Sequence, residues 1–414
     1  MGFVTRVATT SDFDVNGVRI TCGPETFSME PGSQEYVSGC PADRPVLGES
    51  VRVFGRFIKG QNTLAATKLD FKAPELKDVS GSAVIDAAPD RRPLGAPAGS
   101  LMIRADGYRI LIERATQTTW MGPIHSLGDI TANTWVEYKA KARSDGVLVA
   151  DSATFFPNTL MPGEEKAREK VQYDPTAAAV NGRQNALEAG IVGVDFHRIP
   201  PWTDAAMQDR VKAIGKSLIP SWQTGLSATD PAKIDFQFEA VNGNWGPYVI
   251  SLPDGVVLVP HQAVERMQND AQLAALLADG IATVLEKQQY RMRNMLRAMT
   301  IGGVASEAAT FIPVVNLAAY AGLVAFGAGG ASIQVKEMSQ STRVSLDLLQ
   351  DAGYDLGQAP LAWWLLGARK PKPFEDLPTP LQTVVAYHML STVWRATTQT
   401  ETPAPGSVPA TASR

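Results

Sequence analysis

Among its 414 residues the chain has only two cysteines, and it lacks the short motifs that mark common catalytic sites. It contains no Gly-x-Ser-x-Gly elbow, no phosphate-binding P-loop and no Cys-x-x-Cys pair. The sequence signals of serine hydrolases, P-loop nucleotidases and thioredoxin-like enzymes are therefore missing. A strongly basic composition is missing too, since the formal net charge is −4. We therefore expect no nucleic-acid partner.

The two cysteines, Cys22 and Cys40, lie close together near the start of the chain. Such a pair fits a disulfide formed in an oxidising compartment, which would close a loop of roughly 19 residues and contribute about 3 kcal/mol. The alternative is two unpaired thiols. The first residues, Gly2-Phe3-Val4, read as a strand and not as a signal peptide. We expect a bacterial protein exported to the periplasm or cell envelope, with its targeting segment outside this sequence, and both lipid-anchored and soluble forms stay open.

The first 156 residues consist of strand-like runs of alternating apolar and polar residues, separated by turns rich in Gly, Asn, Asp and Pro. The second half of this region repeats the pattern of the first. The stretch Asp14–Thr21 aligns with Arg104–Leu111, which sets Asn-Gly against Asp-Gly, and Thr63–Phe71 aligns with Val147–Phe155. We predict two small barrels of five to six strands, at residues 1–75 and 76–156. Both resemble the OB-like barrels of unknown function in exported bacterial proteins. Trp120 and Trp135 are interpreted as packing residues, with a ligand-stacking platform as the alternative.

The rest of the chain is expected to be α+β and mainly helical, which makes the whole a multidomain protein with an all-β N-terminal half. Residues 157–192 read as a linker with short helices such as Glu164–Lys170, residues 193–395 as the third domain and residues 396–414 as a disordered tail. The apolar segment 301–335 is predicted to form a buried helical hairpin, with membrane contact as the alternative.

The third domain is organised around residues 245–287. A buried strand at Tyr248–Leu252, a Pro-Asp-Gly turn and a second strand at Val256–Val259 predict a hairpin. A long helix follows, with Asn269 as its N-cap and Gln272 completing a variant of the capping box. Apolar residues then recur at helical spacing along one side of this helix.

This hairpin-then-helix pattern resembles the HExxH zinc metallopeptidases of the prenyl-protein endopeptidase family and their soluble exported bacterial relatives. In that family two histidines at i and i+4 bind zinc, and the glutamate between them activates the metal-bound water. The resemblance places Asp279 at the first histidine, Gly280 at the glutamate and Thr283 at the second histidine, in the run Asp-Gly-Ile-Ala-Thr. All three chemical groups are absent.

The family's third ligand is a glutamate just before a run of residues that this chain matches at most positions of Arg343–Asp355. That ligand position falls on Met338, with Glu337 one residue away, and the supporting aspartate falls on Thr342. Asp279 and Glu337 are a weak alternative pair of metal ligands, because zinc prefers nitrogen and sulfur donors. The isolated histidines that remain are interpreted as packing, capping or loop residues: His125, His197, His261 and His388.

These positions predict a catalytically inactive metallopeptidase-like protein that serves as a binding or scaffold protein and holds no cofactor. An extended peptide is expected to add to the edge of the second hairpin strand, at Val256, Val257, Leu258 and Val259. One alternative is an active metal-dependent endopeptidase with zinc on atypical ligands drawn from Asp279, Glu286, Glu337 and a distant histidine. The other is carbohydrate or cell-wall binding by the barrels. No oligomeric state follows from the sequence.

Overall fold

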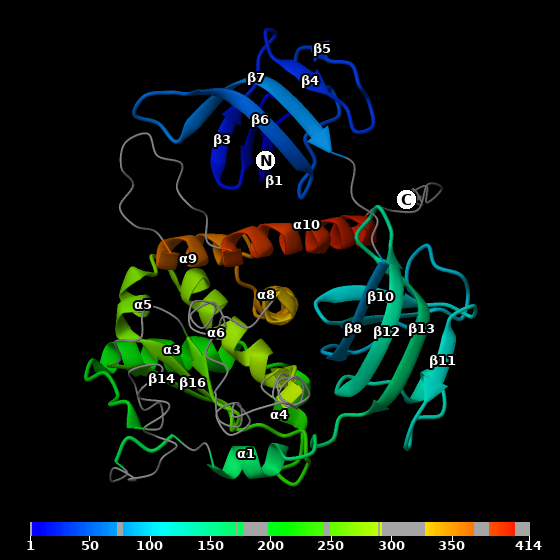
Figure 1. Ribbon diagram of the computed structural model, residues 1–414, viewed down its shortest axis with the longest axis vertical. Coiled ribbons are helices and arrows are strands. Elements are labelled where there is room, and N and C mark those ends of the chain that lie inside the picture. The colour runs from blue at the N-terminus through cyan, green and yellow to red at the C-terminus, as the bar shows by residue number, and fades with distance from the viewer. Residues whose placement is uncertain are drawn as a thin grey trace, which may run out of the picture.

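The computed structural model describes the chain in eight segments, and the account below is restricted to them: residues 2–72, 78–170, 173–176, 198–242, 249–288, 290–291, 328–367 and 381–401. These segments form a sheet-rich N-terminal part and a mainly helical C-terminal part (Figure 1). The predicted division between a β half and a helical half is therefore confirmed at this level.

The N-terminal sheet has the strand order β3-β2-β1-β6-β7-β4-β5. An additional parallel pairing between β3 and β7 closes five of these strands, β1, β2, β3, β6 and β7, into a barrel, called here the first barrel. Alternating residues such as Val4, Phe13 and Leu69 fill its interior and are fully buried. Its strands are β1 (Gly2–Thr9), β2 (Asp12–Val15), β3 (Val18–Thr21), β4 (Phe27–Met29), β5 (Val37–Ser38), β6 (Ser50–Phe57) and β7 (Thr63–Lys72).

The second sheet has the strand order β8-β12-β13-β10-β9, with β11 paired to β13. Beyond the end of β8 two isolated bridges, Ile85 to Ala105 and Asp90 to Met102, join the chain to β9, so the sheet curls into a half-barrel. Trp135 is almost fully buried and donates a hydrogen bond to Ser82, while Trp120 stacks on Phe155, so both tryptophans are packing residues. The strands are β8 (Asp78–Val84), β9 (Leu101–Ala105), β10 (Tyr108–Ile112), β11 (Gln117–Trp120), β12 (Thr134–Ala142) and β13 (Leu148–Pro157).

The two sheets match strand for strand. β1, β2, β3, β6 and β7 of the first correspond to β8, β9, β10, β12 and β13 of the second, and the parallel pairing of β3 with β7 corresponds to that of β10 with β13. The residue Ile20 pairs with Leu64 in one sheet and Ile110 with Leu148 in the other. These are the positions that the sequence repeat aligns. Asn-Gly and Asp-Gly both adopt left-handed backbone angles, as a tight two-residue hairpin turn requires.

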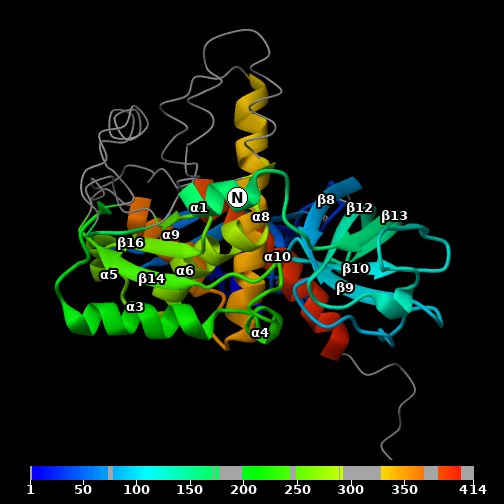
Figure 2. The ribbon, with the colours of Figure 1, turned by 90° about the horizontal axis from the view of Figure 1, so that it is seen from below.

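The helical part surrounds a three-stranded sheet with the order β14-β16-β15. The long helix α8 packs against both α6 and α10 (Figure 2). Gly353 ends α8 with a left-handed backbone, and Tyr354 N–H bonds back to the Leu349 carbonyl at 2.9 Å. The elements are α1 (Glu164–Lys170), α3 (Ala205–Ser217), α4 (Ser221–Gly225), β14 (Gln237–Val241), β15 (Ile250–Ser251), β16 (Val256–Pro260), α5 (His261–Arg266), α6 (Asp270–Leu285), α8 (Ala328–Asp351), α9 (Gln358–Gly367) and α10 (Leu381–Glu401).

Helix α10 runs between the first barrel and the rest of the molecule (Figure 1). A Cβ added to Gly48 of the first barrel would meet the Ser391 backbone at 2.7 Å, and one added to Gly146 of the half-barrel would meet the Thr392 carbonyl oxygen at 2.7 Å. Both glycines have positive φ, so they allow loops from the two sheets to approach the helix closely. Ala396 is buried against the half-barrel, and α10 continues to Glu401. The prediction that a disordered tail begins at residue 396 is therefore wrong.

The predicted apolar hairpin at residues 301–335 lies mostly outside the described residues, since α8 begins at Ala328. In the part of the chain that the structure describes, no helix is both long enough and apolar enough to cross a membrane.

Candidate functional site

Helix α6 carries the positions where the resemblance expects catalytic groups, and its start follows the sequence prediction. The Asn269 side chain accepts a hydrogen bond from Gln272 N–H at 2.9 Å, which caps the helix. The Gln272 side chain reaches back to Gln268 N–H at 2.8 Å, one residue earlier than a standard capping box requires.

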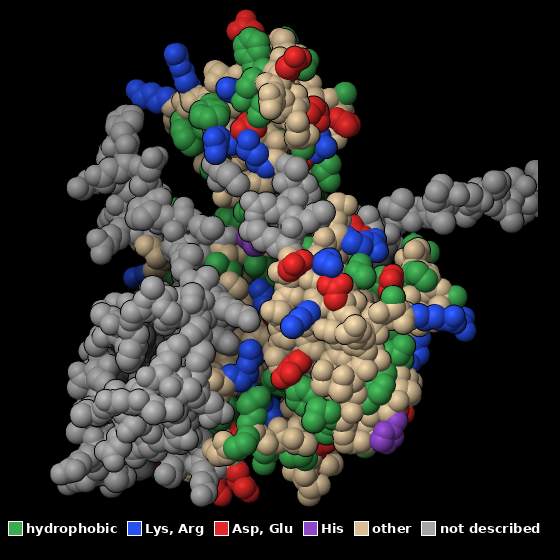
Figure 3. Space-filling view, turned by 45° about the vertical axis from the view of Figure 1, so that its right-hand side comes forward, with side chains coloured by type: hydrophobic (Ala, Val, Ile, Leu, Met, Phe, Trp, Pro, Cys, Tyr) green, Lys and Arg blue, Asp and Glu red, His purple; other side chains and the backbone are tan. Residues whose placement is uncertain are grey.

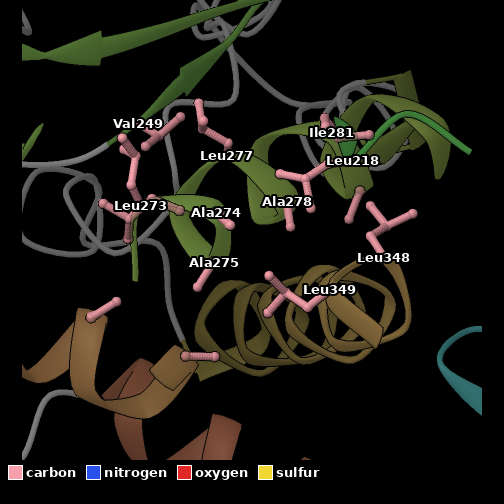
Figure 4. Close-up of a cluster of buried hydrophobic side chains, with 14 of the residues drawn as sticks. Leu218, Val249, Leu273, Ala274, Ala275, Leu277, Ala278, Ile281, Leu348 and Leu349 are labelled. Atoms are coloured by element: carbon pink, nitrogen blue, oxygen red, sulfur yellow. The ribbon is translucent and has the colours of Figure 1, made fainter. Parts of the chain in front are cut away.

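Helix α6 is buried on almost every side. Its residues from Gln272 to Leu285 are all buried. Leucines and alanines of α6 meet Val249 beside the sheet, Leu218 after α3 and Leu349 of α8 in one apolar cluster (Figure 4). The predicted apolar stripe is therefore part of a wider core that also includes the sides where ligands were expected.

Gly280 lies where the resemblance would place a catalytic glutamate, and the space beside it is filled. A Cβ added there would lie 2.9 Å from Ser251 Oγ, 2.9 Å from Val257 Cγ1 and 3.3 Å from Val249 Cγ1. The Ser251 hydroxyl donates to the Gly280 carbonyl at 3.0 Å. Glycine at this position lets the helix lie directly on the hairpin, and no longer side chain fits without displacing buried atoms.

Asp279 and Thr283 lie where the resemblance would place two histidines, and both are buried. The Thr283 hydroxyl donates to the backbone carbonyl of Asp279 at 2.9 Å, the usual i to i−4 bond of a threonine inside a helix. Thr283 thus satisfies its own hydroxyl within the helix.

The prediction that Val256–Val259 form a peptide-binding edge is wrong. Val256–Val259 belong to β16, which is the central strand of the sheet: β14 pairs with it on one side and β15 on the other. Every residue of β16 is buried. The sequence indicated a hairpin but not the parallel pairing with β14, because parallel partners are not adjacent along the chain. The backbone groups of Val256, Val257, Leu258 and Val259 are therefore not available to an added strand.

The remaining ligand candidates do not converge among the described side chains. Glu286 follows Asp279 by seven residues, which separates them by roughly 10 Å along a helix. Glu286 accepts hydrogen bonds from Val84 N–H and the Gln340 amide, both at 3.3 Å. Thr342 is buried on α8, and Met338 and Glu337 precede it on the same helix with side chains outside the description. No group of three His, Cys, Asp or Glu side chains in the described segments is arranged to hold a metal ion.

The three described histidines lie against aromatic rings or in an exposed loop. His261 stacks on Trp202 with ring centroids 3.7 Å apart, and His388 meets Phe3 edge-on at 5.6 Å. His125 is exposed in a loop, and His197 lies outside the described residues. His261 and His388 are thus packed against aromatic rings, as the sequence analysis interpreted isolated histidines.

A buried ionic interface between α8 and the half-barrel is the feature that sequence reasoning missed. Arg343, Asp347 and Asp351 follow one another at intervals of four residues, which places them on one side of α8. Across the interface Arg343 pairs with Asp106, whose carbonyl also accepts from Arg343 Nε at 2.6 Å. Asp347 pairs with Arg109 at 2.9 Å. The signal was a row of charges at helical spacing within an otherwise apolar segment.

The Asp-Gly turn of the repeat is the part of the half-barrel that fits against α8. A Cβ added to Gly107 would lie 2.2 Å from Arg343 Cβ, so a bulkier residue has no room. The Tyr138 hydroxyl donates to Asp106 at 2.6 Å, and the Arg343 guanidinium lies over the Tyr108 ring at 4.6 Å. These contacts make the turn a rigid docking element.

Two carboxyl groups in this interface have raised pKa values. Burial raises the pKa of Asp86 to about 7, although the neighbouring Arg104 lowers it. Burial also raises the pKa of Glu286 well above its ordinary value, with the nearby charge of Asp106 acting in the same direction. Both groups are therefore easier to protonate in the folded protein than in the unfolded chain.

A shallow pocket of about 410 Å³ lies beside the half-barrel. Asn158 donates to Asn133 across its wall at 2.9 Å, and the buried Asn158 Oδ1 has no hydrogen-bond partner in the described part of the chain. Polar groups of Asp129, Thr131 and Asp230 also line this pocket.

Cys22 and Cys40, the remaining predicted pair, are joined by a disulfide in the first barrel, with Cα atoms 5.8 Å apart.

Comparison with known proteins finds no relative: no protein-family model matches the chain, and no curated protein matches it.

Proposed function

We propose that this chain is a non-catalytic, metallopeptidase-like protein that acts as a scaffold in the bacterial cell envelope. The observation that carries the proposal is the contact between Gly280 and the hairpin. A glutamate side chain at this position would have to pass through the space held by Ser251 and Val257. The general base of the family therefore has no place in this core.

The surroundings of Asp279 and Thr283 support the same conclusion. Two oxygen-bearing side chains replace two imidazoles, and zinc binds oxygen ligands less readily than histidine nitrogen. The Thr283 hydroxyl already donates to its own helix. A scaffold role fits the way in which α8 and α10 join both sheets to the helical part through buried contacts.

A peptidase assay tests this proposal. The purified chain, loaded with zinc, is incubated with labelled casein next to a known zinc peptidase as the positive control. We expect no cleavage above background, and the same result for Asp279→Asn, which keeps the shape of the side chain and removes its charge. Cleavage that a chelator abolishes, zinc restores and Asp279→Asn lowers would show an active endopeptidase with atypical ligands and contradict the proposal.

A second candidate function is carbohydrate binding by the half-barrel. The pocket beside Asn158 favours it, because the polar residues Asp129, Thr131 and Asp230 line it and could form hydrogen bonds with sugar hydroxyls. Binding of the full chain to cell-wall glycan fragments, weakened by Asn158→Ala but not by Lys139→Ala on the exposed surface of β12, would support this role. Equal binding by both variants would contradict it.

A further inference from the structure

Among the described residues, most of the exposed large hydrophobic side chains lie on the first barrel and on the strands and loops beside it. Of the eleven large hydrophobic side chains that are exposed in the described segments, eight lie within the first 58 residues. Single exposed apolar residues are normal on protein surfaces, but a concentration of them on one small barrel indicates a contact surface.

Three of these side chains, Phe54, Phe57 and Ile58, lie on β6 and in the turn that joins it to β7. Phe57 and Ile58, at the tip of this hairpin, are 65% and 39% exposed. Phe54 of β6 pairs with Lys68 of β7, and Lys68 pairs in turn with Phe27 of β4, so these three side chains stand in one row on the outer side of the sheet. In Figure 3 hydrophobic side chains lie beside basic ones on the first barrel, at the top of the view.

The same hairpin is strongly basic in an acidic protein. The hairpin, residues 50–72, contains five basic residues and one acidic residue, whereas the whole chain has a net charge of −4. The acidic residue, Asp70, pairs with Lys72, which leaves four basic residues. No carboxylate in the described part of the chain forms an ion pair with any of the four, which are Arg52, Arg56, Lys59 and Lys68. Their charge is therefore available to an anionic partner.

We propose that the β6–β7 hairpin docks the protein onto an anionic phospholipid surface. Phe57 and Ile58 would enter the boundary between headgroups and acyl chains, while Arg56 and Lys59, which flank them, would contact the lipid phosphates. This assignment goes beyond the proposed scaffold role and does not depend on the state of α6.

A lipid surface fits these observations better than a nucleic acid or a glycan. An aliphatic side chain at a protruding tip gains free energy in a bilayer and has no stacking function toward a base or a sugar. One face of the Tyr36 ring is also covered, because the Lys68 ammonium lies 3.8 Å from the centre of that ring.

Vesicle sedimentation of the full chain tests the proposal. We expect binding to phosphatidylcholine vesicles with about one-third phosphatidylglycerol, little binding to pure phosphatidylcholine, and weaker binding at high salt. The double variant Phe57→Ser/Ile58→Ser should lower affinity by about tenfold or more, since it removes the inserted side chains. Arg56→Glu/Lys59→Glu should lower it by roughly 30-fold or more.

Matched controls are available on the half-barrel. Leu94 is 59% exposed, so Leu94→Ser removes a similar apolar side chain far from the hairpin. Lys139→Glu reverses an exposed charge on β12. Both controls should bind as the parent does, and all variants should keep its melting temperature. Equal binding to both kinds of vesicle, unchanged binding by the tip variant, or tighter binding to single-stranded DNA or an acidic glycan than to anionic vesicles would each overturn the proposal.

Discussion

Replacing Gly280 by alanine should change the free energy of unfolding through two effects of opposite sign. Helix propensity alone favours alanine over glycine by about 1 kcal/mol inside a helix. The added Cβ, however, would lie 2.9 Å from Ser251 Oγ and 2.9 Å from Val257 Cγ1. Overpacking of this kind costs about 1–3 kcal/mol, and disturbing the bond from Ser251 to the Gly280 carbonyl costs about 1 kcal/mol more.

The steric effect should win. Ser251 and Val257 lie on buried strands, and Val257 is on the central strand, so neither can move away at low cost. We expect Gly280→Ala to lower the free energy of unfolding by about 1–3 kcal/mol. Chemical denaturation followed by circular dichroism measures this change.

Gly225→Ala is the matched control. Gly225 is at the exposed end of α4, and a Cβ added there meets nothing within 4 Å. This variant should leave stability unchanged or raise it slightly. The loss caused by Gly280→Ala should also be smaller in a Val257→Ala background, where the clashing methyl groups are gone. If Gly280→Ala stabilises the protein as propensity predicts, the space beside α6 is open and the argument against a catalytic glutamate fails.

Three further predictions concern the interfaces. Arg343→Met should destabilise the protein by about 3–5 kcal/mol in thermal or chemical unfolding, because it leaves Asp106 buried without its ion-pair partner. Adding Asp106→Asn should recover part of the loss. Equal stability of the parent and the single variant would contradict this prediction. Burial raises the folded-state pKa of Glu286, so the parent should lose unfolding free energy as the pH rises above about 4.5. Glu286→Gln should therefore be no more stable than the parent at about pH 4 and more stable than the parent at about pH 8, and an advantage confined to low pH would refute the sign. Without reductant, Cys22→Ser/Cys40→Ser should have an unfolding free energy about 3 kcal/mol below that of the parent, and the parent with reductant is the control. No difference between the variant and the parent without reductant would show that the disulfide contributes nothing.

Local signals predicted local structure well. The Asn-Gly and Asp-Gly pairs indicated the two equivalent turns, and Asn269 indicated the start of α6, because each depends on backbone geometry within a few residues. Apolar alternation and the internal alignment were enough to indicate two similar sheets. The register of the parallel pairing, Ile20 with Leu64 and Ile110 with Leu148, follows the same alignment.

Long-range pairings were outside the reach of the sequence. β16 is a central strand because β14 pairs with it in parallel, and no local pattern determines that partner. The pairing of Arg343 with Asp106 joins residues 237 positions apart, so the charges on α8 could be recognised as a row but not assigned to the half-barrel. The aromatic and basic row around Lys68 was likewise hidden, because it combines residues from three strands.

The zinc content of the purified full-length chain tests the central claim most directly. After equilibration with excess zinc and dialysis, metal analysis by mass spectrometry should find far less than one zinc ion per chain, and Asp279→Asn should give the same result. One tightly held zinc ion per chain that is lost in Asp279→Asn would contradict the account.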